Sequence, residues 1–441
     1  MKLGVPKEMV EGERRVGLVP EGVAKLRDRG IEVLVKAGAG RDFNPDAAYE
    51  EAGAEIVEEA DRVWAEADVI VKVRAPTEAE VERARDGQLI VSFLPPVPSA
   101  ELIGRLAQRG VTAVSVDAIP RIARAQSMDA LSSQSSVAGY KCVILGADAL
   151  GKYLPMMTTA AGTTKAAKLM VLGAGVAGLQ AIATARRLGA EVSAFDIRPE
   201  TKEQVESLGA KFVEEEKESR PAKAQASAAP TAPRGGLAGV WDELKLAFGV
   251  SPSADGRNGA AAASDEADSG DEDEASQTST PGGYAREQAE EKQRRDRELI
   301  KGCLADTDVV VTTALIPGRR APILLTAEMV EAMPPGSVVV DLAAEMGGNC
   351  ELTRAGETVE HRGVRILGPR DVPSGLPVHA SQFYSRNVIN LLSHLVDDDG
   401  ELVLDFDDQI TDEAVVCHAG EVRHSAAREA LEGATGAGAS S

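Results

Sequence analysis

Short runs of β-branched residues alternate with amphipathic stretches of about ten residues from the start of the chain onward. This alternation is typical of βαβ units on a parallel sheet. At the usual domain size, 441 residues correspond to two or three domains. The sequence therefore predicts the α/β class, with two Rossmann-like, doubly wound parallel-sheet domains and a cleft between them.

The expected elements form two series. The first has strands at Lys2–Val5, Glu32–Lys36, Val69–Val73, Leu89–Ser92 and Thr112–Ser115, with helices at Pro20–Arg29 and Ala100–Arg109. The second has strands at Lys168–Leu172, Glu191–Phe195, Lys211–Val213, Asp308–Thr312, Ser337–Asp341 and Val364–Leu367. Long helices are expected at Ser132–Leu150 and Ser381–Val396. We predict a first domain at 1–135, completed by about 375–425, and a second at 136–374.

A segment of different composition interrupts the second series. Residues 216–282 are rich in Ala, Ser, Gly, Pro and acidic residues, and Ser264–Glu274 holds seven carboxylates in eleven residues. Such a segment buries too little apolar surface to offset the entropy of ordering it. We predict a disordered acidic insertion at 216–282 and a disordered tail at 426–441.

Charge and cysteine content exclude several classes of protein. With 48 Lys+Arg against 70 Asp+Glu, a net charge of −22 argues against nucleic-acid binding and against direct lipid binding. The four cysteines are scattered and predict neither disulfides nor a metal site. The N-terminus lacks the features of a signal peptide, and the glycine-broken run Leu169–Ala185 is too short to span a membrane.

A glycine-rich motif stands between a buried strand and a helix. Gly173, Gly175 and Gly178 follow the strand Lys168–Leu172 with the spacing GxGxxG, and Val176 opens the helix. In dinucleotide sites these glycines allow the tight turn, the approach of backbone to pyrophosphate, and close packing of helix on strand. The motif predicts a dinucleotide site; a turn that only packs tightly is the alternative.

An acidic residue follows at the expected distance. Asp196 ends the next strand, 18 residues after Gly178, where such sites hold the adenosine ribose hydroxyls. A carboxylate repels a 2′-phosphate, so NAD(H) is favoured over NADP(H), a preference that Arg198 softens.

No histidine lies before residue 360, although dehydrogenases of alcohols and amines place a proton carrier beside the substrate. Lys72 could serve but has no evident partner. Hydride exchange between two nicotinamide rings needs no such group, only alignment and exclusion of water. Residues 120–134, PRIARAQSMDALSSQ, offer polar groups for alignment; taken alone, they could equally be residues that cap a helix.

This stretch resembles a loop of the NAD(H)-binding α subunit, domain I, of proton-translocating nicotinamide nucleotide transhydrogenase. The resemblance extends along nearly the whole chain through GERRVGLVPEGV, MVLGAGVAGLQAIATARRLGAEVSAFDIRPE, GGYARE, TTALIPGRRAP, DLAAEMGGNCE and VLDFDDQ.

The resemblance implies a role for individual residues. The residues that it places at the nicotinamide and the hydride-transfer site are Arg121, Gln126, Asp129 and Ser132, with Arg124, Ser127 and Met128 as further cofactor contacts in the same loop. Val176, Asp196, Ile197 and Arg198 would line the adenosine half, beside the glycines of the motif. Gly283 and Tyr284 would lie in a mobile loop that closes over the nucleotide, and Leu315 near the nicotinamide ribose.

The resemblance also implies partners. Hydride would pass directly between NAD(H) here and NADP(H) on a partner subunit, coupled to proton translocation by a membrane subunit. The chain would be a homodimer held on the cytoplasmic face of a membrane through its partner subunits. The long insertion before GGYARE departs from the family pattern. The acidic excess suggests adaptation to high salt, with a merely acidic linker as the alternative.

Two other functions stay open. Alanine dehydrogenase shares the pattern, and Arg15 and Lys72 resemble its contacts to the substrate carboxylate. Its catalytic histidine, however, would fall in the stretch Ser92–Pro96, which has none. A non-catalytic NAD-sensing subunit is the other alternative, against which the polar loop argues.

Overall fold

The computed structural model describes residues 1–214, 281–315, 320–397 and 400–438. By contacts the chain divides into two units, Met1–Phe212 with Asp306–Ser441, and Val213–Ala305. The first unit contains two large sheets, and in the second the described structure is mainly helix α10 (Pro281–Leu304). No helix in the described ranges is both long enough and apolar enough to cross a bilayer.

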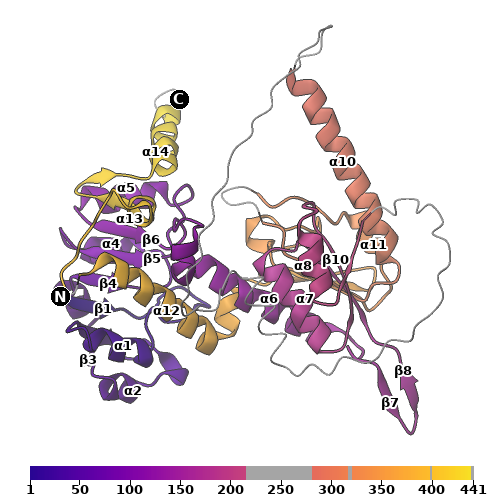
Figure 1. Ribbon diagram of the computed structural model, residues 1–441, viewed down its shortest axis with the longest axis horizontal. Coiled ribbons are helices and arrows are strands. Elements are labelled where there is room, and N and C mark those ends of the chain that lie inside the picture. The colour runs from indigo at the N-terminus through magenta and orange to yellow at the C-terminus, as the bar shows by residue number, and fades with distance from the viewer. Residues whose placement is uncertain (215–280, 316–319, 398–399, 439–441) are drawn as a thin grey trace, which may run out of the picture. The chain divides into compact units, whose positions relative to one another are not determined.

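The first sheet has the order β17-β16-β6-β5-β4-β1-β2-β3 (Figure 1). Its strands are β1 (Lys2–Val5), β2 (Glu32–Lys36), β3 (Glu55–Val57), β4 (Val69–Val71), β5 (Leu89–Ser92), β6 (Thr112–Ser115), β16 (Val415–His418) and β17 (Glu421–Val422). The strands β1 to β6 are parallel, and β16 adds an antiparallel edge to β6. The C-terminal part of the chain thus returns to extend the sheet that the N-terminal part begins.

Helices cover both faces of this sheet. They are α1 (Pro20–Arg27), α2 (Asp46–Glu51), α3 (Ala60–Glu66), α4 (Glu78–Arg83), α5 (Ala100–Gln108), α12 (Pro377–Leu395), α13 (Gln409–Ala414) and α14 (Ser425–Gly438). Alternation along β2 sets the two cores: Val33 and Val35 join one cluster and Leu34 the other. Fully buried strands of this kind are typical of parallel sheets covered on both faces.

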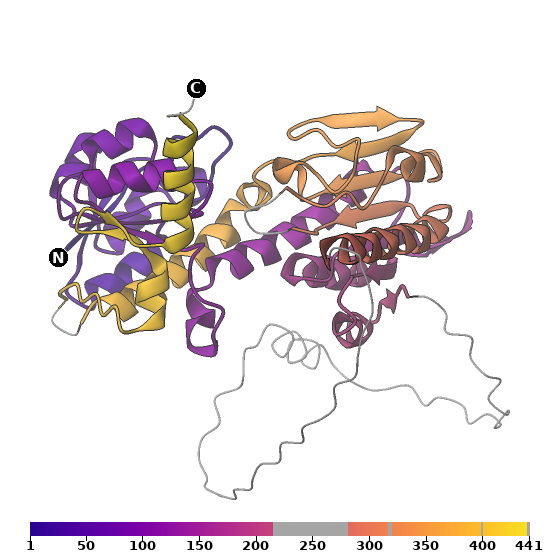
Figure 2. The same cartoon turned by 90° about the horizontal axis from the view of Figure 1, so that it is seen from above.

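The predicted disorder of the tail at 426–441 is wrong over residues 426–438, which belong to helix α14 (Ser425–Gly438). This helix, yellow in Figure 2, packs against α5. Ala427 is fully buried, and a β-carbon on Gly104 of α5 would lie 3.0 Å from Leu431. The apolar positions of the tail therefore have a helix to pack on, which its Ala- and Gly-rich composition does not indicate.

The second sheet has the order β11-β10-β9-β12-β13-β15-β14. Its strands are β9 (Lys168–Leu172), β10 (Glu191–Phe195), β11 (Lys211–Phe212), β12 (Val309–Thr312), β13 (Val338–Asp341), β14 (Thr358–His361) and β15 (Val364–Leu367). All pairs are parallel except β14 with β15. The helices α6 (Ala130–Ala149), α7 (Val176–Arg187), α8 (Thr201–Ser207) and α11 (Ala327–Glu331) belong to this part of the chain.

In both sheets the parallel strands follow the Rossmann order, with the first strand of the series at the centre and the fourth beside it. The predicted class, two doubly wound parallel sheets, is confirmed. A separate hairpin of β7 (Met157–Thr159) and β8 (Gly162–Thr164) is exposed along both strands. The predicted disordered insertion at 216–282 lies outside the described residues, apart from Pro281 and Gly282, which begin α10.

Candidate functional site

The glycine-rich motif forms the turn from β9 into α7. Gly173 has φ of +102°, in the region that favours glycine, and its N–H donates to the carbonyl of Phe195 at 2.8 Å. A β-carbon on Gly178 would lie 1.8 Å from the carbonyl oxygen of Gly173, so helix and strand touch there. A β-carbon on Gly175, by contrast, would meet nothing within 4 Å. The three glycines thus have the separate roles that a dinucleotide loop needs.

The helix that follows can accept a pyrophosphate. Gly175 is the N-cap of α7, and no side chain caps the helix. Its first N–H groups therefore remain available to an anion, and the helix dipole favours one. The open space at Gly175 lets a ligand approach this backbone.

Asp196 lies at the end of β10, beside this turn. Its carboxylate accepts a hydrogen bond from the N–H of Ala174 at 2.7 Å and from the Nε and Nη2 of Arg198, each at 2.9 Å. Burial by itself raises the pKa of Asp196, but these hydrogen bonds outweigh it and the pKa is lowered. Asp196 is therefore ionised at neutral pH, and a ribose that hydrogen-bonds to it must displace the half-exposed Arg198 side chain.

The polar loop follows β6 and leads into α6. Residues Ala123–Met128 form a short 3₁₀ helix, and Asp129 is the N-cap of α6. The Asp129 carboxylate accepts from the Ser132 N–H at 2.8 Å and from the Ser132 hydroxyl at 2.6 Å. Both predicted residues are thus in direct contact, and the capping role considered as an alternative is present.

Other residues of the loop differ in exposure and in their contacts with the rest of the protein. Arg121 and Gln126 are exposed, and neither side chain hydrogen-bonds to another described residue. Arg124 forms an ion pair with Asp408. The side chains of Arg121 and Gln126 could therefore bind a ligand without breaking an internal contact.

The remaining loop residues are tied to the protein. The carbonyl of Ser127 accepts from the side-chain amides of Asn387 and Asn390 on α12 at 2.9 and 3.0 Å. Met128 is 8% exposed and belongs to the core of the first sheet. Its predicted contact with the cofactor stays a prediction.

Four further predicted residues lie in other segments of the chain. Ile197 is 61% and Leu315 is 50% exposed. The backbone of Gly283 and Tyr284 lies in the first turn of α10, in helix where we expected a loop. Their predicted roles at the nucleotide stay predictions.

Both halves of the chain match known proteins. A family model described as alanine dehydrogenase/PNT, N-terminal domain, matches residues 4–138, and one described as alanine dehydrogenase/PNT, C-terminal domain, matches residues 142–425. The chain belongs to the alanine dehydrogenase/PNT family.

Within this family the chain is more similar to transhydrogenase subunits. It is 40% identical over 434 residues to an NAD(P) transhydrogenase subunit alpha chain of Rhodospirillum rubrum, covering 97% of this chain and 98% of that one. The solved transhydrogenase of Sinorhizobium meliloti is 39% identical with a TM-score of 0.74, over 96% and 100% of the two chains. Alanine dehydrogenase of Bacillus subtilis is 27% identical, over 86% of this chain and 81% of that one. The resemblance stated from the sequence is confirmed.

A buried charged cluster joins distant segments of this family member. The carboxylate of Glu13 accepts from Arg15 Nη2 at 2.6 Å, from Arg74 Nε at 2.8 Å and from the Ser374 hydroxyl at 2.7 Å. Arg15 also donates to the side chain of Gln134 in α6 at 3.0 Å. Burial raises the pKa of Glu13, but the hydrogen bonds and charge of Arg15 outweigh it and lower the pKa to about 2.

Sequence reasoning missed Glu13 and Gln134. Both stand within the stretches that resemble the transhydrogenase subunit, but nothing in the sequence shows that Glu13 is fully buried. A run of charges such as Glu13-Arg14-Arg15 after a glycine is equally typical of an exposed loop.

Two cavities lie elsewhere in the described structure. One, of about 900 Å³, is lined by residues of the loop after β1 and of the segments around Glu345 and Arg370. The other, of about 540 Å³, lies near β2. No predicted NAD residue lines either of them. Among the described residues, no group of three or more His, Cys, Asp or Glu side chains could hold a metal ion.

Proposed function

We propose that this chain binds NAD(H) and exchanges hydride directly with NADP(H) held by a partner subunit. The observation that carries the proposal is the polar loop: Arg121 and Gln126 are exposed and unoccupied, while Asp129 is fixed by Ser132 at the start of α6. Free donors beside a fixed carboxylate, without a general base, suit a reaction in which no proton moves at either ring carbon.

The nucleotide itself would supply the hydride, from C4 of its nicotinamide ring. The N-terminus of α7 would bind the pyrophosphate, and Asp196 the adenosine ribose. Arg121 and Gln126 would orient the carboxamide and ribose at the other end, with Asp129 positioned by its hydrogen bonds to Ser132. The charge of Asp196 would disfavour a 2′-phosphate on this chain, so NADP(H) would belong to the partner.

An alanine dehydrogenase would need Arg15 and Lys72 to contact a substrate carboxylate, but both side chains are already paired in this chain. Lys72 is 1% exposed and its Nζ lies 2.8 Å from Glu80 and 3.6 Å from Glu8, while Arg15 pairs with Glu13. Both cations are thus neutralised by buried carboxylates before any substrate arrives. Phe93, within the stretch where that family has its histidine, packs its ring 5.4 Å from that of Tyr384.

Partner subunits follow from the proposed reaction. A membrane subunit would translocate protons, and this chain would attach through it to the cytoplasmic face of the membrane.

A homodimer is proposed at the exposed hairpin β7–β8 and the segment just before it, in which Tyr153 and Met156 are 61% and 65% exposed. Exposed apolar side chains beside an open strand edge favour pairing with a second chain. Sedimentation of Met156→Lys as a monomer, with the parent chain as a dimer, is the expected result.

Isotope transfer tests the reaction. The chain is mixed with a transhydrogenase NADP(H)-binding subunit, NADH deuterated at the transferable C4 position, and NADP⁺. Deuterium in NADPH is expected. Unlabelled NADPH together with oxidation of NADH by pyruvate and ammonia would assign the chain to the alanine dehydrogenases. If the chain binds NADH but supports neither reaction, the non-catalytic NAD-sensing subunit would be the remaining function.

A further inference from the structure

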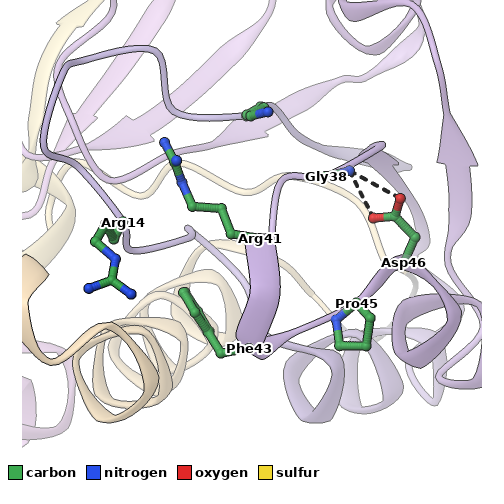
Figure 3. Close-up of a pocket in the computed structure, with 7 residues that line it drawn as sticks. Arg14, Gly38, Arg41, Phe43, Pro45 and Asp46 are labelled. Carbon is green, nitrogen blue, oxygen red and sulfur yellow. Dashed lines mark hydrogen bonds between the residues drawn. The ribbon is translucent and has the colours of Figure 1, made fainter.

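A second polar pocket lies at the carboxyl edge of the first sheet. Strands β1 and β2 are parallel neighbours, and Lys7 and Gly38 each lie two residues beyond a strand end. They line a cavity of about 540 Å³ together with Arg14, Arg41, Phe43, Pro45 and Asp46 (Figure 3). Its volume is within the range of small-molecule sites, and ligands of doubly wound folds bind outside this edge of the sheet.

The pocket gathers positive charge in a chain of net charge −22. Its cations Lys7, Arg14 and Arg41 form no ion pair with any described residue. The only carboxylate among the lining residues is that of Asp46, which accepts hydrogen bonds from the Gly38 N–H at 2.8 and 3.1 Å. Figure 3 shows this carboxylate turned to Gly38, while Arg14, Arg41 and Phe43 lie together on the other side.

The wall that carries Arg41 is held in one conformation. A β-carbon on Gly40 would lie 2.2 Å from the carbonyl oxygen of Asn44 and 2.7 Å from the ring of Tyr49, which is fully buried. Arg41 itself has φ of +53°, a left-handed conformation that costs free energy in a residue with a side chain. Arg41 on this strained turn lines the pocket together with Lys7 and Arg14, and three cations without an ion pair among the described residues attract an anion there.

We propose that this pocket binds a small phosphate-bearing molecule with at least two negative charges. The phosphate oxygens would accept hydrogen bonds from the guanidinium groups of Arg14 and Arg41 and from the ammonium group of Lys7. Guanidinium and ammonium groups are the cations that bind phosphate in proteins. The ring of Phe43 offers an apolar face for the rest of the ligand, so a phosphorylated compound with a planar ring fits as well as a bare pyrophosphate. None of the lining residues belongs to the proposed NAD(H) site, so the two proposals are independent.

Calorimetric titration of inorganic pyrophosphate into the full chain tests this site. Saturating NADH is present, so that pyrophosphate does not enter the glycine loop before α7. Saturable binding of one pyrophosphate per chain is expected, and Lys7→Gln, Arg14→Gln and Arg41→Gly each weaken it about tenfold or more. Lys211→Gln is the matched control: this lysine also is exposed and unpaired among the described residues, but stands at the start of β11.

The Arg41→Gly variant separates binding from folding. Because glycine adopts positive φ without strain, the melting temperature without ligand should not fall, although pyrophosphate binding weakens. Binding that never saturates, or that is equally strong in the three pocket variants and in Lys211→Gln, overturns the proposal. ADP is titrated alongside: tighter binding than pyrophosphate, lost in Phe43→Leu, identifies a nucleotide ligand, and equal binding identifies the phosphate groups alone.

Discussion

Gly139 of α6 lies directly against the carbonyl oxygen of Ala177 in α7, so that a β-carbon on Gly139 would come within 2.1 Å of that oxygen. Helix α6 follows its N-cap Asp129 in the polar loop, and α7 follows its N-cap Gly175 in the glycine-rich motif. Backbone contact between them fixes the distance from one half of the proposed site to the other. No flexible side chain stands between the two helices at this point.

Replacement of Gly139 by alanine should therefore damage both stability and function. The contact atom is backbone and cannot rotate away, so we expect a loss of about 1–3 kcal/mol in the free energy of unfolding. NADH binding should weaken as α7 shifts. Chemical denaturation and NADH titration measure the two effects.

A matched glycine serves as control for this substitution. A β-carbon on Gly433 in α14 would meet nothing within 4 Å, so Gly433→Ala should be neutral or stabilising by up to about 1 kcal/mol. Equal effects of the two substitutions would show that the α6–α7 contact is not tight.

Asp129 can be tested for a role beyond capping. Asp129→Asn keeps one acceptor oxygen for the Ser132 N–H, so stability should change by less than about 0.5 kcal/mol. Hydride transfer to the partner should nevertheless fall at least tenfold. Unchanged transfer would mean that the residue only caps α6.

Removal of Arg121 should affect rate alone. Its side chain is exposed and has no hydrogen bond to another described residue, so Arg121→Ala should leave the melting temperature unchanged. A charge-assisted hydrogen bond to the nucleotide is worth about 1.5–3 kcal/mol, which corresponds to a loss of about tenfold or more in transfer. Single-turnover transfer and thermal melting are the two measurements. An unchanged rate would remove Arg121 from the site.

Asp196 should set the preference between the two nucleotides. Asp196→Asn should weaken NADH binding about tenfold and narrow the gap to NADPH, because the repulsion of a 2′-phosphate disappears. Since the pKa of Asp196 is lowered, NADH affinity in the parent chain should stay constant between pH 5 and pH 8. Asp306→Asn, at an exposed ion-paired aspartate, controls for charge alone.

Glu13 should contribute pH-dependent stability. Its pKa is about 2 in the folded chain, below the ordinary value of 4.5, so the folded state binds the proton less readily than the unfolded one. The resulting stabilisation, on the order of 3 kcal/mol, is fully present above pH 4.5 and is lost as the pH falls toward 2. Glu13→Gln should therefore be strongly destabilised at pH 7, and its difference from the parent chain should shrink below pH 4.5.

An exposed carboxylate provides the comparison for Glu13. Glu21 pairs with Lys25 at the surface, and its removal should cost less than about 0.5 kcal/mol. A pH-independent difference between Glu13→Gln and the parent chain would contradict the expected linkage.

Adaptation of the acidic surface to high salt predicts that KCl raises the melting temperature of the chain. Screening of a net charge of −22 relieves repulsion within the folded state, so the melting temperature should rise with KCl. A melting temperature that falls in molar KCl would contradict the adaptation. A rise that disappears when residues 216–280 are deleted would assign the acidic excess to that segment.

Much of the fold was predictable because the residues that determine it are local. The strands Lys2–Val5, Glu32–Lys36 and Lys168–Leu172 are apolar runs bounded by turns, and their predicted and observed limits agree. The short strands β3, β14, β16 and β17 were not predicted, since each is two to four residues long and is stabilised by pairing with a neighbouring strand. Helix α14 was missed for a similar reason, because its support is α5, far away in the chain.

The class of fold, the glycine loop and the acid after it could all be predicted from the linear pattern of residues. These depend on spacing and residue type, which a linear pattern contains. The three-dimensional packing was needed to show that Glu13 is buried and accepts hydrogen bonds from Arg74 and Ser374, which stand far from it in the chain. It also decided that Lys7, Arg14 and Arg41 share one pocket. Such relations depend on which distant segments pack together and on which charges lose contact with water, and neither is a property of spacing along the chain.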